Sequence, residues 1–308
     1  MSTMHPSEFA TDAEVGVTRG IVYGRAGVGF GSRPVERELK LDLYRPPHSA
    51  GAPPHPVIVL AFGGAFHRGQ RDNDAFEGGN TAIADYCRAF AARGFVACAI
   101  DYRLVPEDPV PGDTPVLFDP RRIPRSRVDH VRALMGLPPA TDEMLWRGIE
   151  AASDDMAMAA RFVIAQAAEW HLDPDRLVLG GFSAGARTAL NAAFAEQVRC
   201  AAVVSLSGYI DPIDLAVHAG RLPLGPRPAV LLVRAERDLD YIRAATPAMA
   251  EALRALGAPC ECATVPGHDH FYPAAAPALH ETRGSASVGA VAMAFVDRAL
   301  AASARRSR

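Results

Sequence analysis

The sequence lacks a basic excess, because its 32 Lys and Arg residues are outnumbered by 35 Asp and Glu residues, for a formal net charge of −3. This balance argues against a nucleic-acid-binding surface, which needs clustered positive charge. The sequence also lacks a run of about 18 apolar residues, so we predict no membrane span. Its first twenty residues carry acidic side chains and no apolar core, unlike a secretory signal. We therefore expect a cytoplasmic protein with neither nucleic-acid nor membrane partners.

Cysteine is also scarce, with an odd number of residues at irregular spacing. A chain of 308 residues can bury most of its unfolded surface, so it does not need disulfides to hold its fold together. We therefore predict buried, unpaired thiols rather than a disulfide framework. The five cysteines are Cys87, Cys98, Cys200, Cys260 and Cys262.

The remaining composition is that of a globular protein, with 49% hydrophobic and 22% charged residues. Residues 36–44 alternate between polar and apolar, which predicts a half-exposed strand. Other apolar runs are continuous, as expected for strands of a parallel sheet covered on both faces. Helical patterns between them predict an α/β fold with a mainly parallel central sheet flanked by helices. The continuous runs are 57–62, 95–100, 177–179, 201–206 and 229–233, and the helical patterns are 81–92, 141–170, 184–195, 247–256 and 288–301.

One stretch interrupts this rhythm, directly after the predicted strand that ends at Ile100. Residues 105–140 are proline-rich and irregular, and a loop of this length in a compact domain usually has a function. We predict a single domain over residues 1–308, with 105–140 as an insertion or cap-like segment. Because ligands bind at the carboxyl ends of parallel strands, its apolar residues, among them Leu117 and Phe118, are expected to line a pocket.

A candidate nucleophile lies in Gly181-Phe182-Ser183-Ala184-Gly185, which fits the pattern G-x-S-x-G. A predicted strand precedes it and a predicted helix follows it, which is the context of a nucleophile elbow. The turn is so tight that only small residues fit beside the serine, and Gly181 and Gly185 meet this need. Ser183 would then lie at a helix N-terminus, where the helix dipole favours negative charge.

A second glycine-containing turn, Phe62-Gly63-Gly64-Ala65-Phe66, directly follows the predicted strand 57–62. Glycines at a strand end allow backbone N–H groups to turn toward a ligand. A nucleophilic serine also needs a base, and the base needs an acid to orient it. The loops after the last predicted strands offer Glu236, Asp238 and Asp240 as acids and His268 and His270 as bases. His268-Asp269-His270 leaves a metal site open as an alternative, although no further ligands cluster nearby.

With these motifs the chain resembles the serine esterases and lipases of the α/β-hydrolase fold, in particular the acetyl-esterase-like group. The resemblance begins at about Leu39 and continues to the C-terminal helix. It includes LDLYRP at residues 41–46, IDYRL at 100–104 and LDPDRLVLGGFSAG at 172–185. The chain departs from the family at Phe62, where a histidine is usual, and this departure affects the geometry of the loop more than the chemistry.

The resemblance implies a carboxylic-ester hydrolase with a catalytic triad of Ser183, Asp238 and His270 and an acyl-enzyme intermediate. It implies an oxyanion hole formed by backbone N–H groups of Ala184 and of Gly64 or Ala65. No cofactor and no metal are implied, and the expected partner is a small-molecule ester. Assembly as a homo-oligomer is left open by the sequence.

Bulky residues beside the nucleophile predict the shape of the substrate pocket. We expect Phe62, Phe66 and Phe182 to line it, which would favour short-acyl or small aromatic esters. Two other functions stay open. The FGGAF loop is close to the H-G-G-x-W loop of formamidases, so a C–N hydrolase, an arylformamidase or a peptidase, could use the same triad. A non-catalytic binding member of the fold is the other.

Overall fold

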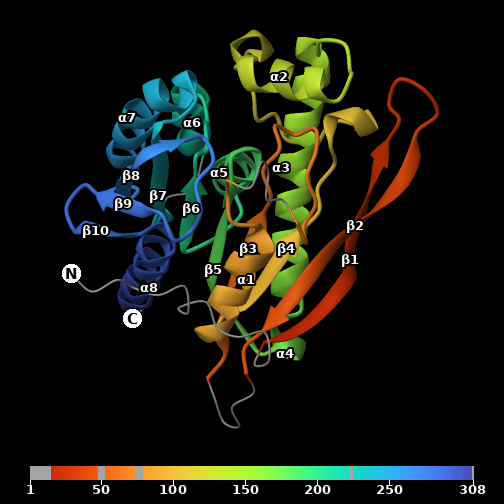
Figure 1. Ribbon diagram of the computed structural model, residues 1–308. Coiled ribbons are helices and arrows are strands. Elements are labelled where there is room, and N and C mark those ends of the chain that lie inside the picture. Colours follow the sequence, from red (N-terminus) through yellow and green to blue (C-terminus); the bar gives the residue numbers. More distant parts are fainter. Residues whose placement is uncertain (1–14, 48–52, 74–78, 222–224, 307–308) are drawn as a thin grey trace.

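The computed structural model describes residues 15–47, 53–73, 79–221 and 225–306. Its centre is a ten-stranded sheet with the order β1-β2-β4-β3-β5-β6-β7-β8-β9-β10, shown in Figure 1. The strands are β1 (Gly16–Val28), β2 (Val35–Arg45), β3 (His55–Ala61), β4 (Val96–Ile100), β5 (Leu172–Phe182), β6 (Ala202–Leu206), β7 (Ala229–Arg237), β8 (Cys260–Asp269), β9 (Pro277–His280) and β10 (Gly284–Ser287).

The middle of the sheet is parallel and its two edges are antiparallel. Strands β4, β3, β5, β6, β7 and β8 pair in parallel, whereas β1, β2, β9 and β10 join by antiparallel pairing. The apolar runs that we assigned to buried strands form β3 to β7, and β4 and β6 are buried along their whole length. The prediction of a mainly parallel α/β sheet is therefore confirmed.

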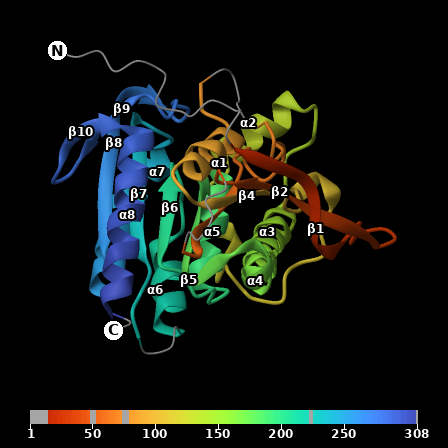
Figure 2. The ribbon, with the colours of Figure 1, turned by 90° about the horizontal axis from the view of Figure 1, so that it is seen from below.

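Helices cover both faces of the sheet, as Figures 1 and 2 show. Helices α1 and α8 lie on one face, and α3, α5 and α7 lie on the other. The expected helix over 141–170 is divided at Gln166, and Thr141 caps its start by accepting a 3.1 Å hydrogen bond from the Met144 N–H. The helices are α1 (Ile83–Ala92), α2 (Ser126–Leu134), α3 (Asp142–Ala165), α4 (Ala167–Trp170), α5 (Ala184–Phe194), α6 (Pro212–Arg221), α7 (Asp240–Ala255) and α8 (Val288–Arg306).

The irregular segment 105–140 contains the short 3-10 helices η2 (Val105–Glu107) and η3 (Pro120–Arg122), followed by α2. In Figure 1 α2 lies at the top of the molecule, beyond the end of α3. Two carboxylates hold the segment to the fold. Glu150 accepts from the Val116 N–H at 3.3 Å, and Glu196 accepts from the Thr114 hydroxyl at 2.8 Å.

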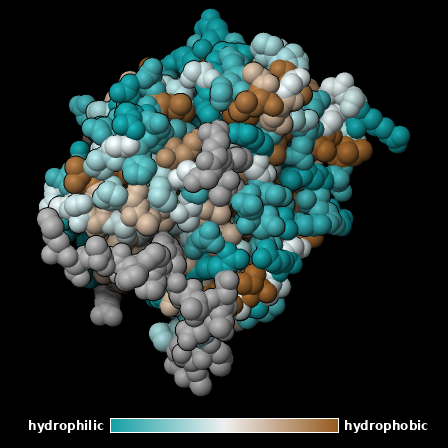
Figure 3. All heavy atoms as spheres, in the orientation of Figure 1, coloured by the Kyte–Doolittle hydropathy of each residue, from teal (hydrophilic) through white to brown (hydrophobic). Residues whose placement is uncertain are grey.

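The face of the molecule in Figure 3 is mostly hydrophilic, with separate hydrophobic spots. Within the described ranges, no helix is both long and apolar enough to cross a membrane. All five cysteines are free thiols. Cys87 and Cys98 are buried as expected, whereas Cys200, Cys260 and Cys262 are only half-buried, which corrects the expectation for these three.

Candidate active site

Ser183 occupies the sharp turn between β5 and α5. Its backbone has φ 53° and ψ −113°, a strained combination for a residue with a side chain, as a nucleophile elbow requires. The turn is packed against the end of β3. A Cβ added to Gly185 would lie 2.1 Å from the carbonyl oxygen of Ala61, and one added to Gly181 would lie 2.4 Å from the same atom. Only glycine therefore fits on either side of this serine.

Three side chains from separate loops meet at this turn. His270 Nε2 lies 2.8 Å from Ser183 Oγ, and His270 Nδ1 lies 2.6 Å from Asp238 Oδ1. Ser183 directly follows β5, Asp238 directly follows β7, and His270 directly follows β8. Because these strands are parallel, their carboxyl ends lie at one edge of the sheet. Parallel pairing thus brings together side chains that are far apart in the sequence.

Asp238 is buried and receives hydrogen bonds from four donors. Besides His270, these are the Ser207 hydroxyl at 2.5 Å, the Ala235 N–H at 3.0 Å and the Leu239 N–H at 2.8 Å. Burial pushes the pKa of Asp238 upward, but the hydrogen bonds from His270, Ser207 and Ala235 outweigh it, so the pKa lies below its usual value. The carboxyl group stays ionised and can hold the Nδ1–H tautomer of His270.

The other acids and the other histidine that the sequence offered lie elsewhere. Asp240 begins α7 with its side chain exposed and pairs with Arg243, and Glu236 accepts from the Gly267 N–H. His268 Nδ1 lies 2.8 Å from the carbonyl oxygen of Pro266.

The side chains of the His268-Asp269-His270 sequence do not converge on a shared metal position. Asp269 pairs with Arg237, while His270 points toward Ser183 and Asp238. Within the described part of the chain, no group of three or more His, Cys, Asp or Glu side chains is arranged to hold a metal ion.

The loop after β3 passes beside the nucleophile. A Cβ added to Gly63 would lie 3.3 Å from Ser183 Cβ, and Gly64 and Ala65 both have positive φ, at 120° and 55°. Within the described residues, the N–H groups of Gly64 and Ala65 donate to no backbone carbonyl. Ala184 is the first residue of α5, so its N–H also has no partner inside the helix. These donors come from the two segments that flank Ser183.

His67 connects this loop to α2. Its Nδ1 lies 2.7 Å from the carbonyl oxygen of Ala65, and its Nε2 lies 3.0 Å from Nη1 of Arg132. Because a guanidinium only donates, Nε2 accepts and the Nδ1–H donates to Ala65. Burial lowers the pKa of His67, which favours this neutral form. Sequence analysis did not single out His67, although it stands next to the FGGAF motif.

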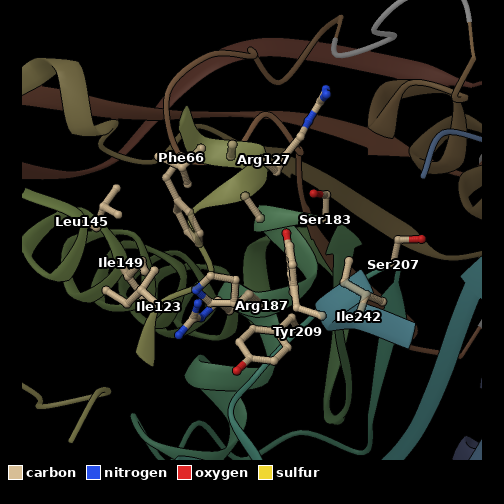
Figure 4. Close-up of a pocket in the computed structure, with 15 residues that line it drawn as sticks. Phe66, Ile123, Arg127, Leu145, Ile149, Ser183, Arg187, Ser207, Tyr209 and Ile242 are labelled. Atoms are coloured by element: carbon tan, nitrogen blue, oxygen red, sulfur yellow. The ribbon is translucent and has the colours of Figure 1, made fainter. Parts of the chain in front are cut away.

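A pocket with about 490 Å³ of free space, counting its open mouth, lies in front of Ser183. Figure 4 shows Phe66, Ile149 and Tyr209 among its walls. The lining residues come from the loop after β3, from segment 105–140, and from α3, α5, α7 and the loop after β6: Ala65, Phe66, Ile123, Pro124, Arg127, Val128, Leu145, Ile149, Ser183, Ala184, Arg187, Ser207, Tyr209, Tyr241 and Ile242.

The three phenylalanines expected in this pocket have different positions. Phe66 lines it, but Phe62 and Phe182 do not, which corrects the expectation for both. Phe62 is buried against the ring of Tyr102, with centroids 4.4 Å apart, and Phe182 is buried beside His270. Both rings therefore pack into the core of the fold and leave the pocket lining to other side chains.

Segment 105–140 forms a wall of the pocket, but with other residues than the sequence predicted. Leu117 is buried and Phe118 is 42% exposed, and neither lines the pocket. Ile123 and Val128, from the region of η3 and α2, take that place. Sequence analysis also missed Ser207, Arg187, Tyr209 and Tyr241. The position of Ser207, directly after an apolar strand that neighbours β5, was the one signal that could have indicated it.

Comparison with known proteins agrees with this architecture. Residues 147–216 match the family described as BD-FAE. Thermogutta terrifontis esterase 2 is similar in structure. Its form phosphoramylated by tabun has a TM-score of 0.55 and 19% identity, with 94% of each chain covered. The form with bound propionate has a TM-score of 0.56 and 18% identity, over 96% of this chain and 93% of that one. No curated protein sequence matches significantly.

These likenesses and the sheet topology define the class of the protein, which has an α/β-hydrolase fold. Among solved structures it is similar to a bacterial esterase from the Planctomycetes. At 18–19% identity this similarity concerns the fold alone. The activity therefore has to be argued from the site.

Proposed function

We propose that this protein is a serine hydrolase of carboxylic esters, with Ser183 as nucleophile, His270 as base and Asp238 as the orienting acid. One observation carries the proposal. Ser183, His270 and Asp238 form a continuous chain of 2.8 Å and 2.6 Å contacts, and Ser183 at the end of this chain lines an open pocket. A serine hydroxyl is a weak nucleophile at neutral pH, and an oriented imidazole is what activates it.

In the first half of the reaction, His270 Nε2 accepts the proton of Ser183 as Oγ attacks the ester carbonyl carbon. The carbonyl oxygen becomes an oxyanion, stabilised by the N–H groups of Ala184 and of Gly64 or Ala65. His270 then gives its proton to the departing alcohol oxygen, leaving an acyl-enzyme. Loss of one such oxyanion donor typically costs about 3 kcal/mol of transition-state stabilisation.

In the second half, water attacks the acyl carbon of the ester on Ser183 while His270 accepts its proton. Collapse of the second oxyanion breaks the bond to Oγ, which recovers its proton from His270, and the carboxylic acid leaves. Asp238 remains ionised throughout, because its hydrogen bonds lower its pKa. Its charge stabilises the imidazolium that forms in each half-reaction.

The similar esterase supports both the proposed ester hydrolysis and the proposed preference for substrates with a short acyl chain. Structures of that enzyme are described with propionate and with butyrate bound, and as phosphorylated by paraoxon. In this chain, Phe66, Ile123 and Leu145 wall the pocket. Apolar walls of this kind suit a small acyl or aromatic group.

A fluorophosphonate probe and 4-nitrophenyl acetate test the proposal together. We expect the wild-type protein to be labelled on Ser183 and to turn over the ester, and the Ser183→Ala variant to lose both properties while keeping its melting temperature. Turnover by Ser183→Ala within about tenfold of wild type would contradict the assignment. Faster turnover of an N-formyl anilide than of matched aryl esters would instead identify a C–N hydrolase.

A further inference from the structure

Arg187 is a charged residue in an otherwise largely apolar part of the pocket. It lies on α5, one helical turn after Ser183, and only 6% of its surface is exposed. Figure 4 shows its guanidinium directed into the pocket between Phe66, Ile149 and Tyr209. Arg127, the other arginine that lines the pocket, points away from it in the same view and lies over the ring of Phe271, 4.8 Å from its centroid.

The guanidinium of Arg187 has no counterion within the described residues. Among the residues that the structure describes, its buried Nε has no hydrogen-bond partner and no carboxylate oxygen lies within 4.0 Å of the guanidinium. The nearest acids are engaged elsewhere, since Asp211 pairs with Arg122 and Asp214 accepts from the Phe118 N–H. The guanidinium carbon lies over the ring of Tyr209, 5.4 Å from its centroid.

An arrangement of this kind is costly for the folded protein. Burial lowers the pKa of Arg187, because the charged form loses its hydration. Buried charges are normally paired, since an isolated one is strongly destabilising. A cation that remains unpaired in the same pocket as the nucleophile has the character of a ligand-binding group.

The geometry points to Arg187 as the subsite for a carboxylate carried by the substrate, so that the enzyme acts on esters bearing a second, ionised carboxyl group. This inference rests on the proposed ester hydrolysis and specifies its substrate class. A planar guanidinium fork matches a carboxylate with two parallel hydrogen bonds. A single cation among apolar walls balances one negative charge, which favours a carboxylate over a phosphate carrying about two.

The spacing limits which esters can satisfy both groups. The Cα atoms of Ser183 and Arg187 are separated by four residues of helix, or about 6 Å. A substrate whose carbonyl lies at Ser183 therefore has its carboxylate several bonds away. Half-esters of medium-length dicarboxylic acids and acyl esters of hydroxybenzoic acids both have this shape. The first would place the carboxylate on the acyl side and the second on the alcohol side.

Two matched pairs of substrates test the inference. On the acyl side, 4-nitrophenyl hydrogen adipate is compared with methyl 4-nitrophenyl adipate, and on the alcohol side, 4-acetoxybenzoate with its methyl ester. We expect the wild-type kcat/KM for the anion to exceed that for the methyl ester by roughly tenfold or more in one pair. Arg187→Met should remove this preference, and Arg187→Lys should keep part of it. No preference in either pair, or one that Arg187→Met leaves unchanged, would overturn the inference.

Arg127→Met is the matched control, because it removes an arginine from the same pocket. It should change the preference less than Arg187→Met, and the reverse order would contradict the role of Arg187. The melting temperature of Arg187→Met distinguishes a ligand-binding role of Arg187 from a structural role. Loss of an unpaired buried charge should leave it unchanged or raised, whereas a structural arginine would lower it.

A binding measurement separates this inference from the proposed reaction. Calorimetry with Ser183→Ala and 4-acetoxybenzoate or monomethyl adipate detects carboxylate binding without turnover. We expect binding of at least one of these carboxylates that Arg187→Met in the same background weakens by roughly tenfold or more. Such binding, if wild type hydrolyses no ester, would contradict the proposed ester hydrolysis and still support the carboxylate subsite. If wild type hydrolyses neutral esters but carboxylate binding does not depend on Arg187, the proposed hydrolysis would stand and the subsite would be contradicted.

Discussion

Ser207 donates a 2.5 Å hydrogen bond to Asp238, on the carboxylate oxygen opposite the one that His270 contacts. Ser207 directly follows β6, and its Oγ also lies 3.0 Å from the phenol oxygen of Tyr272. The side chain that orients the histidine is therefore itself oriented. We regard Ser207 as a positioning residue, because it acts through Asp238.

Ser207→Ala should lower kcat/KM for 4-nitrophenyl acetate by roughly tenfold, because Asp238 loses one charge-assisted hydrogen bond and keeps the others. Ser205→Ala, two residues earlier and within β6, is the matched control. The Ser205 hydroxyl is also buried but has no hydrogen-bond partner among the described residues. It should leave kcat/KM unchanged, and equal losses in both variants would show that Ser207 acts only through packing.

The two histidines and the two aspartates of the site offer paired comparisons. His270→Ala should reduce kcat/KM by roughly 10⁴-fold, since members of a triad act as a unit. His268→Ala should have little effect, because within the described ranges its side chain bonds only to the Pro266 carbonyl. Asp238→Asn should likewise cost far more than Asp240→Asn. A reversed order in either pair would mean that the residues named here are not the catalytic ones.

Acyl length should affect kcat/KM because bulky apolar side chains wall the pocket that Ser183 lines. In a series of 4-nitrophenyl esters we expect the highest kcat/KM at about two to six carbons. Phe66, Leu145 and Ile149 wall the pocket and limit the space for a longer chain. A maximum at about ten carbons or more would instead indicate an open acyl groove.

Stability should fall with rising pH near neutrality because of Glu150, which is buried on α3 and holds the Val116 N–H. Burial raises its pKa to about 7, from about 4.5 in the unfolded chain. Between these values only the folded state keeps the proton. The stabilisation is therefore complete below the lower pKa and is lost as the pH rises through the upper one.

Glu150→Gln should remove the share of this pH dependence that comes from Glu150, while keeping an oxygen for the Val116 N–H. Glu196, whose pKa burial also raises to about 7, retains its own share. Thermal unfolding should show the variant about 1–2 kcal/mol more stable than wild type at pH 8, and not more stable at pH 5. The exposed Glu251→Gln on α7 is the control, and its stability should follow wild type at both pH values. A variant less stable than wild type at pH 8 would show that the charged carboxylate is needed there.

Local sequence patterns were sufficient for the parallel centre of the sheet and for the elbow. Continuous apolar runs, such as the one that became β3, correspond to strands buried on both faces. The elbow at Ser183 could be predicted because its glycines, its strand and its helix are neighbours in the chain. The strands β1, β9 and β10 were missed, because none of them has a long apolar run and the last two are also short.

What the sequence by itself determined, then, was the fold class and the position of the turn that carries Ser183, since both depend on residues close together in the chain. The family resemblance implied Asp238 and His270 as the partners of Ser183, but only the tertiary structure showed that their side chains, and not those of Asp240 and His268, form one chain of contacts with it. The tertiary structure also placed Phe62 and Phe182 outside the pocket lining. It also placed Ser207 behind Asp238 and left Arg187 unpaired in the pocket. These relationships depend on parallel strand pairing, which brings distant loops to one edge of the sheet and leaves no periodic trace in the sequence.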